Sequence, residues 1–318
     1  MDQITVILAV VFAVLVGRND GAPLVALAIR SLHQRIWWPP LVLLIAIVGV
    51  PFSGVHGVAS TLAEMFRVST GGSGWGLAVL LVSTIATLVV STATGIPTSI
   101  TLALVGASAG AQVAGGGLDA GRVLRVLLLA AAGPVAAWIL ALVVTRILTL
   151  ARGRHVERAV RWQQVTGFVA TAIAYGANDG QKLLAVFAVL FGAGATVAAQ
   201  DPRVVLTVVG CFAAGIVVGL RRSAHALRQG VLRPKPYQVA STLWSSASAV
   251  MLGAVGGAPM SMTQSITGAL IGSAPPREWR RVRWEQSRRI VLAWVWTLPV
   301  AAVIGWALTL TITPLGNN

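Results

Sequence analysis

Two copies of a short polar motif interrupt stretches that are otherwise apolar. The first is "GRNDG" at residues 17–21, and the second is "GANDG" at residues 176–180. Glycine loosens a helix and frees backbone carbonyls, while asparagine and aspartate supply the hard oxygen ligands that suit a proton or a small cation such as sodium. We therefore expect a cation or proton site at each motif, with both aspartates as metal ligands if the ion is sodium. The expected ligands are Asn19, Asp20, Asn178 and Asp179.

A simpler interpretation of the two aspartates stays open. Asp20 and Asp179 each have a base nearby in the sequence, Arg18 and Lys182, and such pairs can form buried salt bridges that hold no ligand. That interpretation does not explain why the motif occurs twice at equivalent places. Lys182 can counter an aspartate or contact an anion, and the sequence does not decide between these roles.

A second repeated feature combines a proline with hydroxyl side chains. A helix is expected to end near Gly95 or Gly256 and to restart at Pro97 or Pro259. Proline suits the first position of a helix, and the free N–H groups that follow, together with the helix dipole and the hydroxyls, favour an anion. The alternative is a close helix packing face, which we prefer for Gly106, Gly110, Gly268 and Gly272. The expected anion ligands are Thr98, Ser99, Thr101, Ser261, Thr263, Gln181 and Lys182.

These features lie in a chain with the composition of an integral membrane protein. Of the 318 residues, 56% are hydrophobic and only 10% are charged. The apolar runs are continuous rather than alternating, which indicates helices and not a β-barrel. The net charge of +15 comes mainly from short basic loops near residues 30–35, 146–161, 221–235 and 277–289, which is typical of a cytoplasmic face against anionic lipid and argues against a nucleic-acid partner. The charged residues that follow the first apolar run also argue against a cleavable signal peptide.

The motifs are parts of an internal repeat that covers the chain. The "NDG" motifs recur at an offset of 159 residues, "PTSITLALVGASAG" aligns with "PMSMTQSITGALIG" at 162, and "PVAA" recurs at 165. Placing every basic loop on one side gives the halves opposite orientation and leaves both termini outside, provided that residues 2–32 cross the membrane once. We predict an all-α polytopic membrane protein with two inverted-topology repeats, broken helices and proline-pinched hairpins. Its parts are residues 1–150, a cytoplasmic linker at 151–160, and residues 161–318.

Binding an anion beside bare carboxylates would be repulsive. A bound cation or proton that neutralises Asp20 and Asp179 removes that repulsion, so cation binding favours anion binding. This mutual dependence is the thermodynamic content of symport. The repeated motifs therefore predict a secondary transporter for an anion.

At these residues the chain resembles the inorganic phosphate transporter (PiT) family. The resemblance is carried, in order, by "GRNDGAPLVA", "GIPTSITLALVGASAG", "YGANDGQKLLAV", "APMSMTQSITGALIG" and "VRWEQSRRIVLAWVWTLPVAA". It implies phosphate transport coupled to sodium or protons by an inverted-repeat protein that forms a homodimer; some similar proteins carry sulfate. The chain departs from the family pattern at four positions: Arg18, Pro23, Leu102 and Met262.

These observations predict a multi-pass inner-membrane transporter that imports inorganic phosphate by alternating access. We expect no enzyme activity, because no nucleophile, base or metal-ligand spacing gathers at one centre, and no cofactor beyond the coupling ion. Phosphate, or sulfate, and the lipid bilayer are the expected partners. A sulfate permease of the same family and an anion sensor or scaffold without transport are the alternatives.

Overall fold

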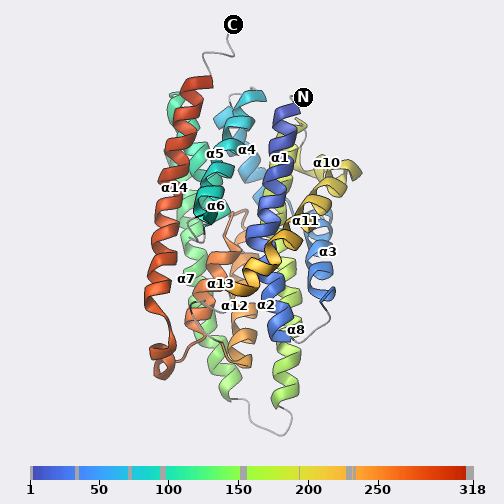
Figure 1. The fold of residues 1–318 in the computed structure, drawn as a ribbon, viewed down its shortest axis with the longest axis vertical. Helices are drawn as coiled ribbons and strands as arrows, with labels where there is room; N and C mark the ends of the chain where they lie inside the picture. Colours follow the sequence, from blue (N-terminus) through green and yellow to red (C-terminus); the bar gives the residue numbers. More distant parts are fainter. Residues whose placement is uncertain are drawn as a thin grey trace.

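Helices make up every element of the part of the chain that the structure describes. The computed structural model describes residues 3–32, 36–70, 74–93, 98–150, 156–192, 194–226, 231 and 234–312. Figure 1 shows the helices as a long bundle. They are α1 (Gln3–Val16), η1 (Gly17–Gly21), α2 (Ala22–Leu32), α3 (Trp38–Phe52), α4 (Gly57–Thr70), α5 (Gly74–Ala93), α6 (Ile100–Ala114), α7 (Ala120–Leu150), α8 (Val156–Tyr175), η2 (Gly176–Gly180), α9 (Gln181–Leu190), α10 (Ala195–Gln200), α11 (Pro202–Ala226), α12 (Pro236–Val255), α13 (Met262–Gly272), η3 (Pro276–Arg281) and α14 (Trp284–Ile312).

Several helices are long and apolar enough to cross a membrane. Five described helical segments meet both conditions, and a sixth is reached if α3 and α4, which are bent by 75° relative to each other, count as one span. One of the five runs without interruption from Gln3 to Arg30. This single segment agrees with the expectation that the start of the chain crosses once. The other four are Trp75–Thr92, Ala120–Leu150, Pro202–His225 and Trp284–Ile312.

The two Asn-Asp motifs are π-helical turns inside continuous helices. Helix α1 passes through η1 into α2, and α8 passes through η2 into α9. At the first motif the N–H of Ala22 donates to the carbonyl of Gly17, five residues earlier. The expected break in the helix is therefore wrong at both motifs, because a wider turn accommodates the glycines without stopping the helix. Such turns are frequent at functional sites.

Two helical hairpins approach the middle of the bundle from opposite ends. Helices α5 and α6 form the hairpin in the upper part of Figure 1, and α12 and α13 form the one in the lower part. The hairpins meet where the hydroxyl of Thr101, on α6, donates to the carbonyl of Met260, just before α13, at 3.1 Å. The predicted break at Gly95 and Pro97 lies outside the described residues. In the second hairpin, α12 ends at Val255, next to Gly256 as predicted. The predicted restart at Pro259 is wrong, because the side chain of Ser261 caps the helix and α13 begins at Met262, which leaves Pro259 outside it.

Each hairpin packs against the last helix of the other half of the chain. A Cβ atom on Gly110 of α6 would lie 1.9 Å from the carbonyl oxygen of Ala302 in α14, and one on Gly272 of α13 would lie 2.3 Å from that of Trp138 in α7. Gly106 and Gly268 make the same kind of approach to the same two helices. The packing interpretation of these four glycines is confirmed, because only hydrogen fits between the backbones.

The direction of the helices differs between the halves. In Figure 1, α1 starts at the upper end and runs down, whereas α8, its counterpart in the sequence repeat, starts at the lower end and runs up. The start of α1 and the end of α14 lie at one end of the molecule, and basic η3 lies at the other. These directions support the inverted relation of the halves. Which side of the membrane holds the termini stays a prediction, and of the proposed linker, residues 151–155 lie outside the described part.

Candidate functional site

The second Asn-Asp motif holds a buried ion pair. The ammonium of Lys182 donates to Asp179 Oδ1 at 2.6 Å, and Asn178 Nδ2 donates to Asp179 Oδ2 at 3.0 Å. The side chains of Lys182 and Asp179 are only 2% and 1% exposed, so the charges compensate each other in surroundings from which water is excluded. The salt bridge that the simpler interpretation anticipated is present at this motif.

The carbonyl of Met260 joins this pair to the tip of the lower hairpin. Three side chains donate to it: Lys182 at 2.6 Å, Asn178 at 2.6 Å and Thr101 at 3.1 Å. The amide oxygen of Asn178 accepts in turn from the N–H of Met260 at 2.9 Å. Asn178 therefore holds both backbone groups of one residue, which fixes the hairpin tip against the π-helical turn.

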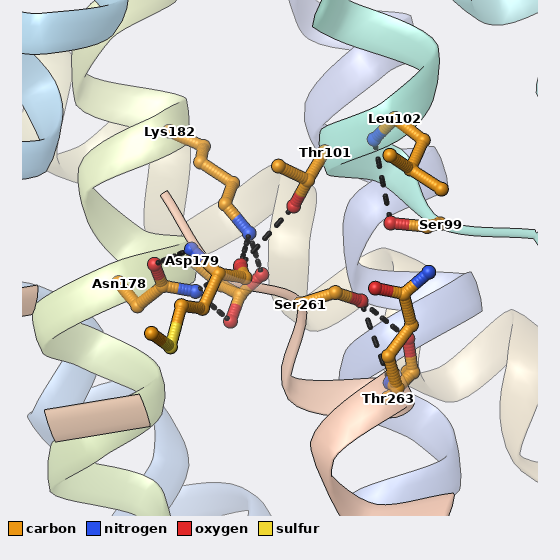
Figure 2. A network of polar contacts seen from close by, with 10 residues as sticks. Ser99, Thr101, Leu102, Asn178, Asp179, Lys182, Ser261 and Thr263 are labelled. Atoms are coloured by element: carbon orange, nitrogen blue, oxygen red, sulfur yellow. Dashed lines mark hydrogen bonds and ion pairs between the residues drawn. The ribbon is translucent and has the colours of Figure 1, made fainter. Parts of the chain in front are cut away.

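The helices α6 and α13 begin with equivalent serine caps. Ser99 Oγ accepts from the N–H of Leu102 at 3.3 Å, and Ser261 Oγ accepts from the N–H of Gln264 at 3.4 Å. Figure 2 shows these two N-termini beside Lys182 and Asp179. Because each serine oxygen acts as an acceptor toward its own helix, its hydroxyl proton is left to point elsewhere. Both helix dipoles place their positive ends in this region.

The remaining predicted anion ligands lie around these caps with different partners. Thr263 Oγ1 lies 3.1 Å from Ser261 Oγ, and either atom can donate. Thr98 is half-buried just before the cap of α6. Gln181 is engaged otherwise: its Oε1 accepts from the N–H of Ala59 at 3.0 Å and its Nε2 donates to the carbonyl of Ala177 at 2.5 Å. The side chain of Gln181 thus ties α4 to the second π-helical turn.

The first Asn-Asp motif differs from the second, because two of its buried polar side-chain atoms have no hydrogen-bond partner. Asp20 is only 3% exposed, yet its Oδ1 accepts no hydrogen bond. The Nδ2 atom of Asn19 is also buried and unpaired. Arg18 is half-buried, and no ion pair among the described residues joins it to Asp20. A buried carboxylate with an unpaired oxygen is costly and is a functional-site signal in a membrane protein.

Two groups near the site are not foreseen by the sequence. The Met260 carbonyl is a backbone group whose role depends on how the hairpin meets η2. The hydroxyl of Tyr175 is buried without a hydrogen-bond partner, and its ring packs 5.9 Å from that of Phe212 in α11. The one signal for Tyr175 is its place directly before the second motif.

Among the described residues, no group of three or more His, Cys, Asp or Glu side chains could hold a metal ion.

Glycines allow each of the two motifs to pack directly against the backbone of another helix. A Cβ atom on Gly17 would lie 2.2 Å from the carbonyl oxygen of Phe212 in α11, and one on Gly176 would lie 2.2 Å from that of Ala46 in α3. Each π-helical turn therefore rests directly on a helix of the other half, as the hairpins do. These contacts between the halves place both motifs in the interior of the bundle rather than against lipid.

Apolar helices of this length, with buried charges and two hairpins meeting in the interior, define a polytopic membrane protein of the transporter type. The model of the phosphate transporter family matches residues 149–305. A probable low-affinity inorganic phosphate transporter of Mycobacterium bovis is 32% identical over 257 residues, which cover 77% of this chain and 59% of that protein. One from Rhizobium meliloti is 28% identical over 310 residues, covering 93% of this chain and 92% of that protein.

A solved structure has the same fold. That structure, described as "The sodium-dependent phosphate transporter", superposes with a TM-score of 0.81 at 15% identity and covers 98% of both chains. The chain belongs to the phosphate transporter family, as its motifs predict. The family and these relatives are transporters, so the prediction that the chain is not an enzyme is confirmed. The chain spans 59% of the length of the mycobacterial relatives.

Proposed function

We propose that this protein imports inorganic phosphate across a cell membrane by symport with sodium or protons and alternating access. The observation that carries the proposal is the meeting of two capped helix N-termini, one from each half, beside a buried ammonium. The relatives named as phosphate transporters support phosphate as the anion. The structural neighbour is named as sodium-dependent, which motivates sodium as the first ion to test.

The anion would bind between the starts of α6 and α13. The free N–H groups of two first turns and the hydroxyl protons of Ser99 and Ser261 supply donors, and helix dipoles add positive potential. Thr98 and Thr263 border the same region, and Lys182 contributes its charge. Thr101 contributes through its hold on the Met260 carbonyl. Gln181 is left out of this proposed ligand set, because both ends of its amide already have protein partners.

The cation would bind at the Asn-Asp motifs and neutralise their carboxylates. The unpaired Oδ1 of Asp20 is the group most in need of a positive partner. Occupation of such a site lowers the repulsion between the aspartates and an incoming anion, so the two ligands favour each other. Because the site lies where the two hairpins meet, a rocking motion of one half against the other would expose it to either side in turn.

Uptake of radiolabelled phosphate into proteoliposomes tests the proposal. We expect an inward sodium gradient or an inward proton gradient to accelerate uptake by the purified protein. Unlabelled phosphate should compete and sulfate should compete weakly, because a protonated phosphate can also donate a hydrogen bond. Stronger competition by sulfate would identify a sulfate permease. Binding of phosphate without uptake would identify a sensor or scaffold.

The serine caps provide a matched test of the anion site. Ser261→Ala removes one hydroxyl donor, and we expect the KM for phosphate to rise about fivefold, as the loss of one hydrogen bond worth about 1 kcal/mol implies. Ser53→Ala is the control, since Ser53 Oγ is exposed and donates to the carbonyl of Val50 at the end of α3. Equal KM values for the two variants would remove Ser261 from the site.

The homodimer stays a prediction, which light scattering in detergent can check.

A further inference from the structure

The two repeated motifs share the pattern Gly-X-Asn-Asp-Gly, with Arg18 and Ala177 at X, but their aspartates have different electrostatic surroundings. At Asp179 both carboxylate oxygens accept hydrogen bonds, from Lys182 at 2.6 Å and from Asn178 at 3.0 Å. At Asp20 the Oδ1 atom has no partner, and neither does Nδ2 of the adjacent Asn19. Among the described residues, Lys182 and Asp179 form the one ion pair in which both side chains are buried. The difference therefore concerns charge, and not only hydrogen bonding.

The sequence repeat explains this difference at a single position. Lys182 lies three residues after Asp179, and the equivalent position after Asp20 is Pro23. Proline has neither a charge nor a donor, so the first half has nothing that reaches its aspartate from that place. Arg18, the other base near Asp20, is half-buried and forms no ion pair with it in the described structure.

The ammonium of Lys182 occupies the ligands that a bound cation would use. It lies 2.6 Å from a carboxylate oxygen of Asp179 and 2.6 Å from the carbonyl oxygen of Met260. Hard oxygen ligands of these two kinds are the ones that alkali cations take in helical transporters. A second positive charge at the same oxygens would be repelled by the ammonium at short range. The second motif is therefore filled by a charge that the chain itself supplies.

The surroundings of the first motif contain unpaired hydrogen-bond donors as well as acceptors. The Tyr175 hydroxyl is fully buried and has no hydrogen-bond partner, and it lies within electrostatic range of Asp20 and Asp179. Its ring packs on Phe212, the residue whose carbonyl lies directly over Gly17 of the first motif. Three unpaired polar atoms, on Asp20, Asn19 and Tyr175, thus belong to the surroundings of one π-helical turn.

We propose that Lys182 is a tethered cation that permanently fills the second motif, so that one exchangeable cation, bound at the first motif by Asp20 with Tyr175 beside it, couples transport. This inference rests on the proposed function. It assigns one coupling charge to each phosphate instead of two, and it gives the duplicated motifs different roles. It also makes Tyr175 a cation-site residue.

The dependence of uptake on the driving cation tests this stoichiometry. The initial rate of phosphate uptake into proteoliposomes is measured at increasing external sodium and fixed pH, and then at varied external pH and fixed sodium. The cation whose concentration changes this rate is the coupling cation. We expect a Hill coefficient close to 1 for wild type. Lys182→Asn replaces the ammonium by a neutral ligand and should raise the coefficient toward 2. Asp20→Asn should remove the dependence on the cation. A wild-type coefficient of 2 would overturn the inference without any variant.

Lys235→Asn is the matched control, because the Lys235 ammonium pairs with Glu278 in a partly exposed position far along the chain from the motifs. We expect its Hill coefficient to equal that of wild type.

A measurement without transport separates failure of the inference from failure of the proposed function. Equilibrium binding of the cation that the uptake assay identifies, as radiolabelled sodium or as protons counted by titration, should show one more bound ion per purified chain for Lys182→Asn than for wild type. An unchanged number would overturn the tethered-cation role even if phosphate uptake is confirmed. Absence of uptake together with the extra bound ion would contradict transport and leave the tethered cation standing. Lys182→Gln is used in the same way if the asparagine variant does not fold.

Discussion

The carbonyl of Met260 is the atom around which the site is organised. It accepts hydrogen bonds from Lys182, Asn178 and Thr101. Asn178 and Lys182 lie in the continuous helix of η2 and α9 in the second half, and Thr101 lies in α6 of the first half. Side-chain donors at such a point hold a hairpin tip in place more firmly than apolar packing does, because each bond has a direction. The chemistry of the site therefore depends on a backbone group that the residue types alone do not reveal.

Asn178 offers a test of this arrangement at the scale of one residue. Asn178→Leu would leave the buried N–H of Met260 without its acceptor, and we expect a loss of about 1–3 kcal/mol in the free energy of unfolding. Thr101→Val is the comparison, since the carbonyl then keeps two of its three donors, and the loss should be smaller. Thermal unfolding in detergent measures both. Equal stability of the two variants would contradict the role given to Asn178.

The sequence could predict the side chains of the site better than their partners. Asn178, Asp179 and Lys182 stand out because polar residues in an apolar helix need compensation, and the pairing of Lys182 with Asp179 is one of the two roles weighed for it. The unpaired Oδ1 of Asp20 could not be predicted, because the sequence places Arg18 near Asp20 much as it places Lys182 near Asp179. The place of Gln181 between α4 and η2 also depends on contacts 122 residues apart.

At the scale of elements, the π-helical turns are the main departure from expectation. Glycines on both sides of Asn-Asp are compatible with a broken helix and with a widened turn, so the motif alone does not distinguish them. The continuous apolar segment from Gln3 to Arg30 favours the widened turn, because a break would leave carbonyls unpaired within the membrane. The break near Gly256 was predictable from the glycines and the proline, but the start of α13 was not, because the cap at Ser261 places it after Pro259.

The glycine contacts between α6 and α14 yield a prediction for the packing of elements. Gly110→Ala forces a methyl group against the Ala302 carbonyl, and we expect the free energy of unfolding to fall by about 1–3 kcal/mol. Gly49→Ala in α3 is the control, because nothing lies within 4 Å of the added Cβ atom. There the substitution should be neutral or slightly stabilising. Thermal unfolding of the two variants side by side would show whether close approach, and not helix propensity, is decisive.

The short helix η3 carries a pH-sensitive contact. Lys235 donates to Glu278, and this hydrogen bond, together with the charges of Lys235 and Arg281, lowers the pKa of Glu278 from its ordinary value of 4.5. A carboxyl group whose pKa is lowered by folding stabilises the folded state above the ordinary pKa, and this stabilisation is lost as the pH falls through the lowered value.

We therefore expect Glu278→Gln to reduce the melting temperature at neutral pH. The difference from wild type should shrink as the pH falls below about 4.5. Melting curves of both proteins across that range provide the measurement. A difference that stays constant with pH would show that the ion pairs of Glu278 contribute nothing to stability.

At the scale of the whole molecule, the direction of the helices predicts where the ends of the chain lie. Cysteines placed at Gln3 and at Glu285, in a Cys211→Ser background, mark the two ends of the bundle. We expect a membrane-impermeant maleimide to label the first in intact cells and the second only after lysis, because basic η3 precedes Glu285 and basic loops stay inside. The reverse pattern would invert the predicted topology.

The crosswise contacts of the hairpins bear on how the chain is made. Helix α6 leaves the ribosome long before α14, the helix against which Gly106 and Gly110 pack. Until then its small-residue face has no partner of its own and must be sheltered by lipid, by an insertase or by earlier helices. Co-translational assembly of the first half therefore remains incomplete while most of the second is still being synthesised, and separately expressed halves should mature only when they are produced together.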